Sequence, residues 1–267
     1  MLAPLDNGTI FKTAFTDKIV FKQFVKDILG IDIEVDKIET EKKFEPRVGN
    51  IDISLDIFAE SIDQRVIIEI LRIDYDYNFD RFLHYFTMAI AQQQQSALEY
   101  KIDKTVYTIV VLTAPYKLDD KSQRTIRDEV LITSMDPRNL ADRVVPIYGH
   151  KLVFLNHHYR NDNTPGNYRD WLDLFYESIQ NPGSYKVNLE NAGVKKAVEL
   201  IDYDKLDPAT VHLMKVDAQR KVTYRLDLEE GIKKEKIEIA LKMKKKGMDR
   251  TLISEITGLS NEELEKL

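Results

Sequence analysis

The chain has 267 residues, of which 43% are hydrophobic and 31% are charged, and its formal net charge is −6. This length and apolar content suit one core domain with an accessory segment and argue against a long disordered or low-complexity protein. The complete lack of cysteine excludes disulfides, thiolate metal sites and cysteine nucleophiles.

The start of the chain has no basic segment followed by an apolar one, and no uninterrupted apolar run nears the ~18 residues of a membrane span. We therefore expect a cytoplasmic protein with no membrane partner. The net negative charge argues mildly against a nucleic-acid partner, but the local distribution of charge matters more than the total.

The first predicted element is a helix over residues 9–29, which Asn7 would cap and Gly30 would end. Its apolar residues recur at helical spacing, so we expect a core helix. Residues 35–44 alternate enough for a first strand, and Pro46 and Gly49 mark the turn that follows.

Two apolar runs that each contain carboxylates come next. In residues 51–57, Asp52 and Asp56 alternate with apolar side chains, and residues 66–70 form a β-branched run interrupted by Glu69. We interpret the pair as a hairpin. Adjacent strands lie about 4.8 Å apart, so Asp56 and Glu69, on one face, could share a divalent cation.

Other interpretations of these acids stay open. Asp52 shares the face of Asp56 and is the alternative first ligand, although it lies roughly 13 Å further along the strand, and Glu60 is a weaker candidate. The acids could also be solvated, or could pair with a neighbouring cation (Lys42, Lys43 or Arg72). Leu71 shares the face of Glu69, and its side chain can neither bind a metal nor orient a water.

A long helix is predicted over residues 79–100, with Arg81 and Tyr85 one turn apart on one face. The apolar run 105–112 predicts a central strand, which the preceding strand and helix favour as parallel in the same sheet. Residues 144–154 are expected to add a strand pair around Tyr148, and residues 167–180 an amphipathic helix in which Trp171 packs in the core.

The composition becomes helical beyond Pro182 and Gly183, so we divide the chain into a core domain, 1–182, and a helical C-terminal region, 183–267. Residues 233–246 hold a dense set of lysines, which either face phosphates or are solvated. The last elements resemble a helix-turn-helix in outline. The final helix, 261–267, is acidic, so we favour a packing or homo-oligomerisation element over reading of DNA.

The acidic hairpin resembles that of a known family. Asp56, Glu69-Ile-Leu71 after 13 residues, Asn78-Phe-Asp-Arg81 and Tyr85 resemble the Rpn-type recombination-promoting nucleases and putative transposases of the PD-(D/E)XK superfamily. Members typically carry Asp and then Glu-x-Gln on two strands. Asp56 and Glu69 match this pattern, whereas Leu71 departs from it.

The resemblance implies an α/β fold, a mixed central β-sheet flanked by helices, with a helical C-terminal extension. It implies a DNA endonuclease that hydrolyses phosphodiester bonds with Mg²⁺, which Mn²⁺ can replace. Asp56 and Glu69 would be the metal ligands and Leu71 would stand at the catalytic Gln position. Arg81 and Tyr85 would contact the substrate. Because of Leu71, impaired cleavage is expected, and the alternative is an inactive DNA- or protein-binding member of the same scaffold.

Overall fold

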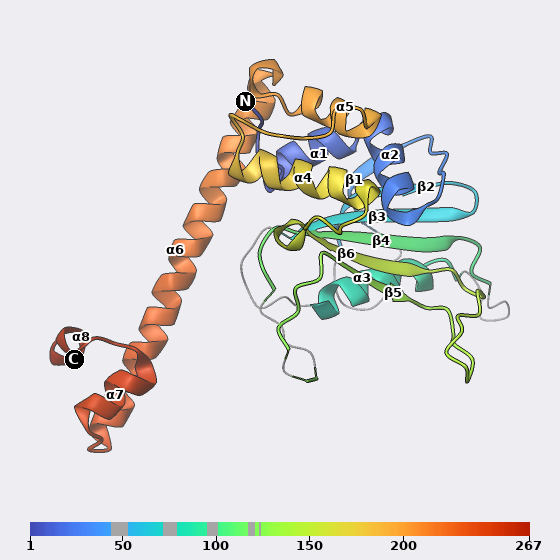
Figure 1. Ribbon diagram of the computed structural model, residues 1–267. Helices are drawn as coiled ribbons and strands as arrows, with labels where there is room; N and C mark the ends of the chain where they lie inside the picture. The colour runs from blue at the N-terminus through green and yellow to red at the C-terminus, as the bar shows by residue number, and fades with distance from the viewer. Residues whose placement is uncertain (44–52, 72–78, 95–100, 117–120, 123) are drawn as a thin grey trace. The chain divides into compact units, whose positions relative to one another are not determined.

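The computed structural model describes residues 1–43, 53–71, 79–94, 101–116, 121–122 and 124–267 (Figure 1). The chain forms two compact units, Met1–Met214 and Lys215–Leu267. The helical region expected from residue 183 onward therefore contributes its first helix to the first unit.

The first unit opens with two helices, α1 (Gly8–Phe15) and α2 (Lys18–Leu29), where the sequence predicted one. The side chain of Asn7 accepts hydrogen bonds from the amides of Thr9 and Ile10, as a cap should. Asp17 accepts from two amides of α2 and so starts a new helix, which explains the break. Gly30 ends α2 in the left-handed conformation, as predicted.

A mixed six-stranded sheet forms the centre of this unit, in the order β1-β2-β3-β4-β6-β5. Strands β3, β4 and β6 run parallel to one another, whereas β1, β2 and β5 are antiparallel to their neighbours. The strands are β1 (Ile38–Lys42), β2 (Leu55–Glu60), β3 (Gln64–Leu71), β4 (Thr105–Leu112), β5 (Val130–Ser134) and β6 (Lys151–Asn156). The acidic hairpin and the central parallel strand are thus confirmed.

Some element boundaries differ from the sequence prediction. The partner strand of β6 is β5, at residues 130–134, so the strand pair predicted over residues 144–154 is wrong in its first half. Val144, Val145 and Ile147 are instead exposed in the connection between β5 and β6. Helix α3 (Phe79–Ala91) is shorter than predicted, and residues 95–100 lie outside the described residues.

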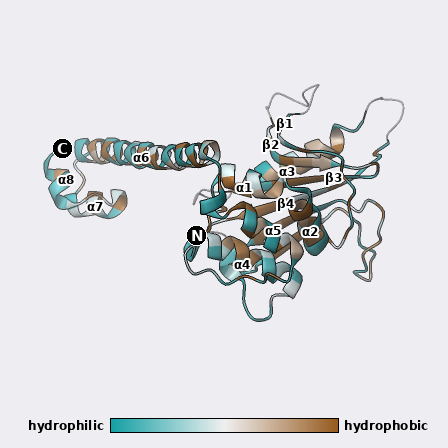
Figure 2. Cartoon of the chain, turned by 90° about the horizontal axis from the view of Figure 1, so that it is seen from above, coloured by the Kyte–Doolittle hydropathy of each residue, from teal (hydrophilic) through white to brown (hydrophobic). Residues whose placement is uncertain are grey.

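Helices cover both faces of the sheet (Figure 1). One face carries α1, α2, α4 (Gly166–Gln180) and α5 (Ala192–Leu200), and the other carries α3. The strands between these layers stand out as hydrophobic in Figure 2. The 3-10 helices η1 (His157–Tyr159) and η2 (Tyr203–Lys205) complete the unit.

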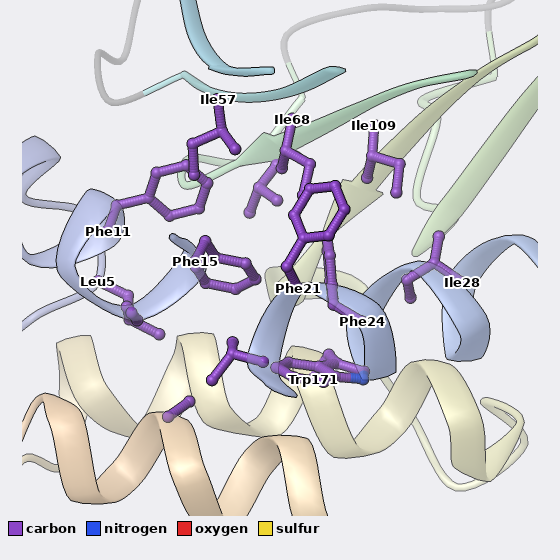
Figure 3. Packing of buried hydrophobic residues seen from close by; sticks show 14 of the residues in the cluster. Leu5, Phe11, Phe15, Phe21, Phe24, Ile28, Ile57, Ile68, Ile109 and Trp171 are labelled. Atoms are coloured by element: carbon purple, nitrogen blue, oxygen red, sulfur yellow. The ribbon is translucent and has the colours of Figure 1, made fainter. Parts of the chain in front are cut away.

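The core of the first layer is built from aromatic rings on several helices (Figure 3). Phe24 packs edge-on against both Phe15 and Trp171, with centroids 4.9 Å apart in each pair. The indole nitrogen of Trp171 donates to Asp27 at 2.8 Å, so this buried ring also satisfies its polar group. Trp171 is a core residue, as predicted, and α1 and α2 are fixed against the sheet by this packing.

The second unit contains α6 (Pro208–Lys245) from Lys215 onward, together with α7 (Arg250–Thr257) and α8 (Asn261–Glu265). A small apolar cluster holds these helices together, and its buried members are Ala240, Met243, Ile253, Leu259 and Leu264. Among the described helices of both units, none is both long enough and apolar enough to cross a membrane.

The close approach of α2, α4 and α5 depends on Gly193. A Cβ placed there would lie 2.6 Å from the Cβ of Gln23 and 3.0 Å from the ring of Trp171. We expect Gly193→Ala to lower the free energy of unfolding by about 1–3 kcal/mol, because the Cβ of Gln23 is fixed by its helix and the ring of Trp171 is fully buried in the core. Urea denaturation measures this change. Gly166→Ala, which would meet nothing within 4 Å, is the control, and equal loss in both variants would contradict the account.

Candidate active site

The acidic hairpin brings Asp56 and Glu69 to the point where the pairing of its two strands ends. Backbone pairing of β2 with β3 runs from Glu60 and Arg65 to Ile57 and Ile68. Asp56 and Glu69 are the next residues on each strand. This register therefore places both acids at one end of the hairpin.

At this end the two carboxylates replace the backbone carbonyls as hydrogen-bond acceptors. The amide of Asp56 donates to Oε1 of Glu69 at 2.9 Å, and the amide of Ile70 donates to Oδ2 of Asp56 at 3.1 Å. Each carboxylate is thus fixed by an amide of the opposite strand. This hydrogen bond satisfies a backbone donor that the pairing of the two strands leaves without a carbonyl partner. Both side chains are held in place by the two strands that carry them.

The electrostatics of this pair are unfavourable for two negative charges. Glu69 is only 1% exposed, and burial, together with the charge of Asp56, raises the pKa of Glu69 to about 8. The hydrogen bond from the Asp56 amide and the charges of Arg81 (which lowers this pKa) and Glu41 (which raises it) act more weakly. A cation between the carboxylates would relieve this repulsion, and carboxylate oxygens are the ligands that Mg²⁺ prefers.

Protein side chains alone would not surround such an ion. In the part of the chain that the structure describes, no three His, Cys, Asp or Glu side chains lie together in a way that could hold a metal. Asp56 and Glu69 would therefore supply two sides of the coordination shell. Water and substrate oxygens would fill the rest, as is usual for Mg²⁺ bound near phosphates.

Two residues that the sequence analysis did not single out also lie at this site. Lys12, on α1, has its Nζ atom 3.9 Å from Oδ1 of Asp56 and forms an ion pair with Glu41 on β1. Glu41 also accepts a hydrogen bond from Ser54 at 2.8 Å. Its backbone has a φ of 52°, which is uncommon for a residue other than glycine and often marks a functional site.

A signal for Lys12 was present in the sequence. It is the one charged residue between Asn7 and Phe15, in a stretch of helix that is otherwise mostly apolar. No comparable signal existed for Glu41, because the register of β1 on β2 decides its position and that register depends on the fold.

The residues expected to contact the substrate lie on the α3 side of the sheet. Leu71, which stands at the expected Gln position, lies on the same side. It is partly buried and packs against the apolar cluster that contains Tyr85. Arg81 donates from Nε to the hydroxyl of Tyr85 at 3.0 Å, and its guanidinium lies 5.2 Å from that ring centre. Arg81 therefore stands close enough to influence Glu69, while Tyr85 is largely a core residue that holds Arg81 in place.

The other acids and cations that the sequence offered for this site lie elsewhere or outside the described residues. Glu60 lies at the far end of β2, where it pairs with Arg65 at 3.0 Å and Lys104 at 3.4 Å, so its role is structural. Asp52 and Arg72 lie outside the described residues. Of the other two suggested cations, Lys42 pairs with Glu39 at 2.9 Å, and Lys43 directly follows β1.

Two adjacent histidines, His157 and His158, begin η1 directly after β6. Their rings stack with centroids 4.3 Å apart. Burial lowers the pKa of His157 to about 3, and this ring stays neutral at ordinary pH. Nothing about this pair indicates catalysis.

The family of the chain follows from comparison with known protein families. A family model described as PD-(D/E)XK nuclease family transposase matches residues 9–235. The chain belongs to this nuclease family. A second model, described as the C-terminal HTH domain of the Rpn/YhgA-like nuclease family, matches residues 233–267. No curated protein and no solved structure matches the chain. The resemblance and the α/β fold expected from the sequence are thus confirmed.

The second unit of this nuclease family member contains the region matched by the C-terminal HTH model, residues 233–267. Two acids of α8 form ion pairs within the unit, Glu263 with Lys233 at 2.8 Å and Glu265 with Arg250 at 3.0 Å. Glu263 also completes a capping box with Ser260. These acids have internal partners, so the acidic composition of α8 is a weak argument against DNA binding, and the preference for a packing role loses that support.

The raised pKa of Glu69 predicts a pH-dependent gain in stability when its charge is removed. The folded pKa (about 8) lies above the ordinary value of 4.5, so the carboxyl destabilises the fold increasingly as the pH rises between these values. In chelator, Glu69→Gln should raise the free energy of unfolding by about 2–4 kcal/mol at pH 8.5 and by much less at pH 5.

Denaturant unfolding at the two pH values measures this effect. Glu39→Gln on β1 is the control, because hydrogen bonding to Lys42 lowers the pKa of Glu39 and its removal should bring no gain. An equal gain for Glu69→Gln at both pH values would contradict the electrostatic account of the site.

Proposed function

We propose that the chain is a Mg²⁺-dependent DNA endonuclease, with Mn²⁺ able to replace Mg²⁺, whose cleavage rate is reduced by Leu71. The observation that carries this proposal is that Asp56 and Glu69, at the end of the hairpin, are each held by a hydrogen bond from a backbone amide of the opposite strand. Two carboxylates held together at the expense of charge repulsion suit a cation site better than a structural role.

Each residue would have a defined task. Asp56 and Glu69 would hold the ion, and the backbone amides would keep their oxygens in position. Arg81, supported by Tyr85, would bind a phosphate oxygen of the DNA. When bound, Mg²⁺ supplies positive charge to the phosphate and lowers the pKa of the attacking water.

Leu71 favours a second candidate function, a DNA- or protein-binding member of the family without turnover. Its side chain stands on the face of Glu69, where a Gln would offer both a hydrogen-bond donor and an acceptor to the water. Leucine offers neither. Metal binding does not depend on this position, so an inactive member would still bind the ion.

Restoring an amide at position 71 tests the two candidates. We expect Leu71→Gln to raise Mg²⁺-dependent cleavage of plasmid DNA by about 10²-fold or more, because a positioned group that orients or relays protons typically contributes that much. Leu71→Met, which keeps an apolar side chain of similar volume, is the matched control and should bring no gain. Adding Asp56→Asn should abolish the gain.

The outcomes separate the hypotheses. Efficient cleavage by the unaltered chain, unchanged by Leu71→Gln, would show that another group orients the water. No cleavage by either form, in Mg²⁺ or Mn²⁺, would favour the binding protein without turnover.

A further inference from the structure

We propose that Lys12 is a catalytic residue that binds the scissile phosphate, and that Glu41 is a positioning residue that holds Lys12 until the phosphate arrives. This inference rests on the proposed function, because it adds a phosphate-binding cation to the same site. It concerns the side of the site that faces α1, whereas Arg81 acts from α3.

The position of Lys12 is fixed by the fold. Helix α1 is capped by Asn7 and anchored by Phe11 and Phe15, which are fully buried and stack with centroids 4.6 Å apart. From this helix the Lys12 side chain, 24% exposed, reaches to within 3.9 Å of Oδ1 of Asp56. A rigid element thus presents an ammonium group beside a proposed metal ligand, while the side chain keeps access to solvent.

The partner of Lys12 is held in an unfavourable backbone conformation. Glu41 has a positive φ, and its carboxylate accepts from both Lys12 and Ser54. Left-handed backbone at a residue other than glycine is disfavoured and recurs at ligand-binding sites and switch regions. Glu41 is well exposed, with 58% of its side chain accessible. Another anion can therefore replace Glu41 as the partner of Lys12 without burying a charge.

A DNA phosphate supplies such an anion. The ammonium of lysine carries three donors on a flexible stem, so Lys12 can turn from Glu41 to a phosphate oxygen while it stays near Asp56. It would then stabilise the negative charge that develops on the phosphate during attack by water. Lys12 forms no covalent bond and transfers no proton in this step. Together, Lys12 and Arg81 would place one cation on each side of the carboxylate pair.

A purely structural role for Lys12 makes different predictions. If Lys12 served only to neutralise Asp56, its loss would weaken the fold or the binding of metal and would leave DNA affinity unchanged. If Lys12 binds phosphate, its loss should lower DNA affinity and kcat while the Mn²⁺ affinity stays the same or rises, because a positive charge near the ligands is removed.

The first measurement needs neither metal nor turnover. DNA binding by the full chain is titrated over a range of salt concentrations in chelator, for the unaltered chain and for Lys12→Met. We expect Lys12→Met to reduce the slope of log affinity against log salt by about one unit, the loss of one phosphate contact. Lys22→Met is the matched control, because Lys22, on the neighbouring helix α2, forms a similar ion pair with Glu34 and its loss should leave the slope unchanged.

The second measurement is cleavage in the Leu71→Gln background with Mg²⁺. There Lys12→Met should lower kcat by about 10²-fold, and Lys12→Arg should restore part of it. Glu41→Gln should lower KM severalfold, because the phosphate no longer competes with a full negative charge for Lys12.

An unchanged salt slope and unchanged kcat in Lys12→Met would overturn this inference while leaving the metal site intact. A parallel loss of Mn²⁺ affinity and thermal stability in Lys12→Met would also overturn it, by assigning Lys12 to structural support. By contrast, no cleavage in the Leu71→Gln background together with no Mn²⁺ binding dependent on Asp56 would refute the proposed function itself.

Discussion

The candidate site depends on one constraint, that Asp56 and Glu69 must share the space at the end of the β2 and β3 pairing. Each carboxylate accepts an amide from the opposite strand, so neither can turn away without leaving a backbone donor unsatisfied. The cost of this arrangement appears in the raised pKa of Glu69. Natural proteins keep such unfavourable pairs mainly where function requires them.

Much of this arrangement could be predicted from local sequence pattern. Strand alternation gave the face of Asp56, Glu69 and Leu71, because side-chain direction in a strand has a period of two. The cap at Asn7 and the stop at Gly30 were also visible, since single residues determine them. The break before Asp17 was missed because apolar residues continue at helical spacing across it, and the competing cap is a weaker signal than that periodicity.

The remaining features depend on tertiary contacts. The connection around Val144 and Ile147 was mistaken for a strand because its apolar residues resemble one, yet these side chains are exposed. Glu41 reaches the site only through the pairing of β1 on β2, in which Thr40 faces Ile57 and Lys42 faces Leu55. Membership of the nuclease family, which the match over residues 9–235 establishes, is consistent with this site but assigns no role to any single side chain.

The most direct test of the central claim is a crystal structure of the chain soaked with Mn²⁺, with anomalous diffraction used to locate the ion. The account predicts one strong anomalous peak within coordination distance, about 2.0–2.3 Å, of carboxylate oxygens from both Asp56 and Glu69. The peak should vanish in an Asp56→Asn crystal that diffracts equally well. A well-ordered site without a peak, or a peak bound to other residues alone, would contradict the shared metal site.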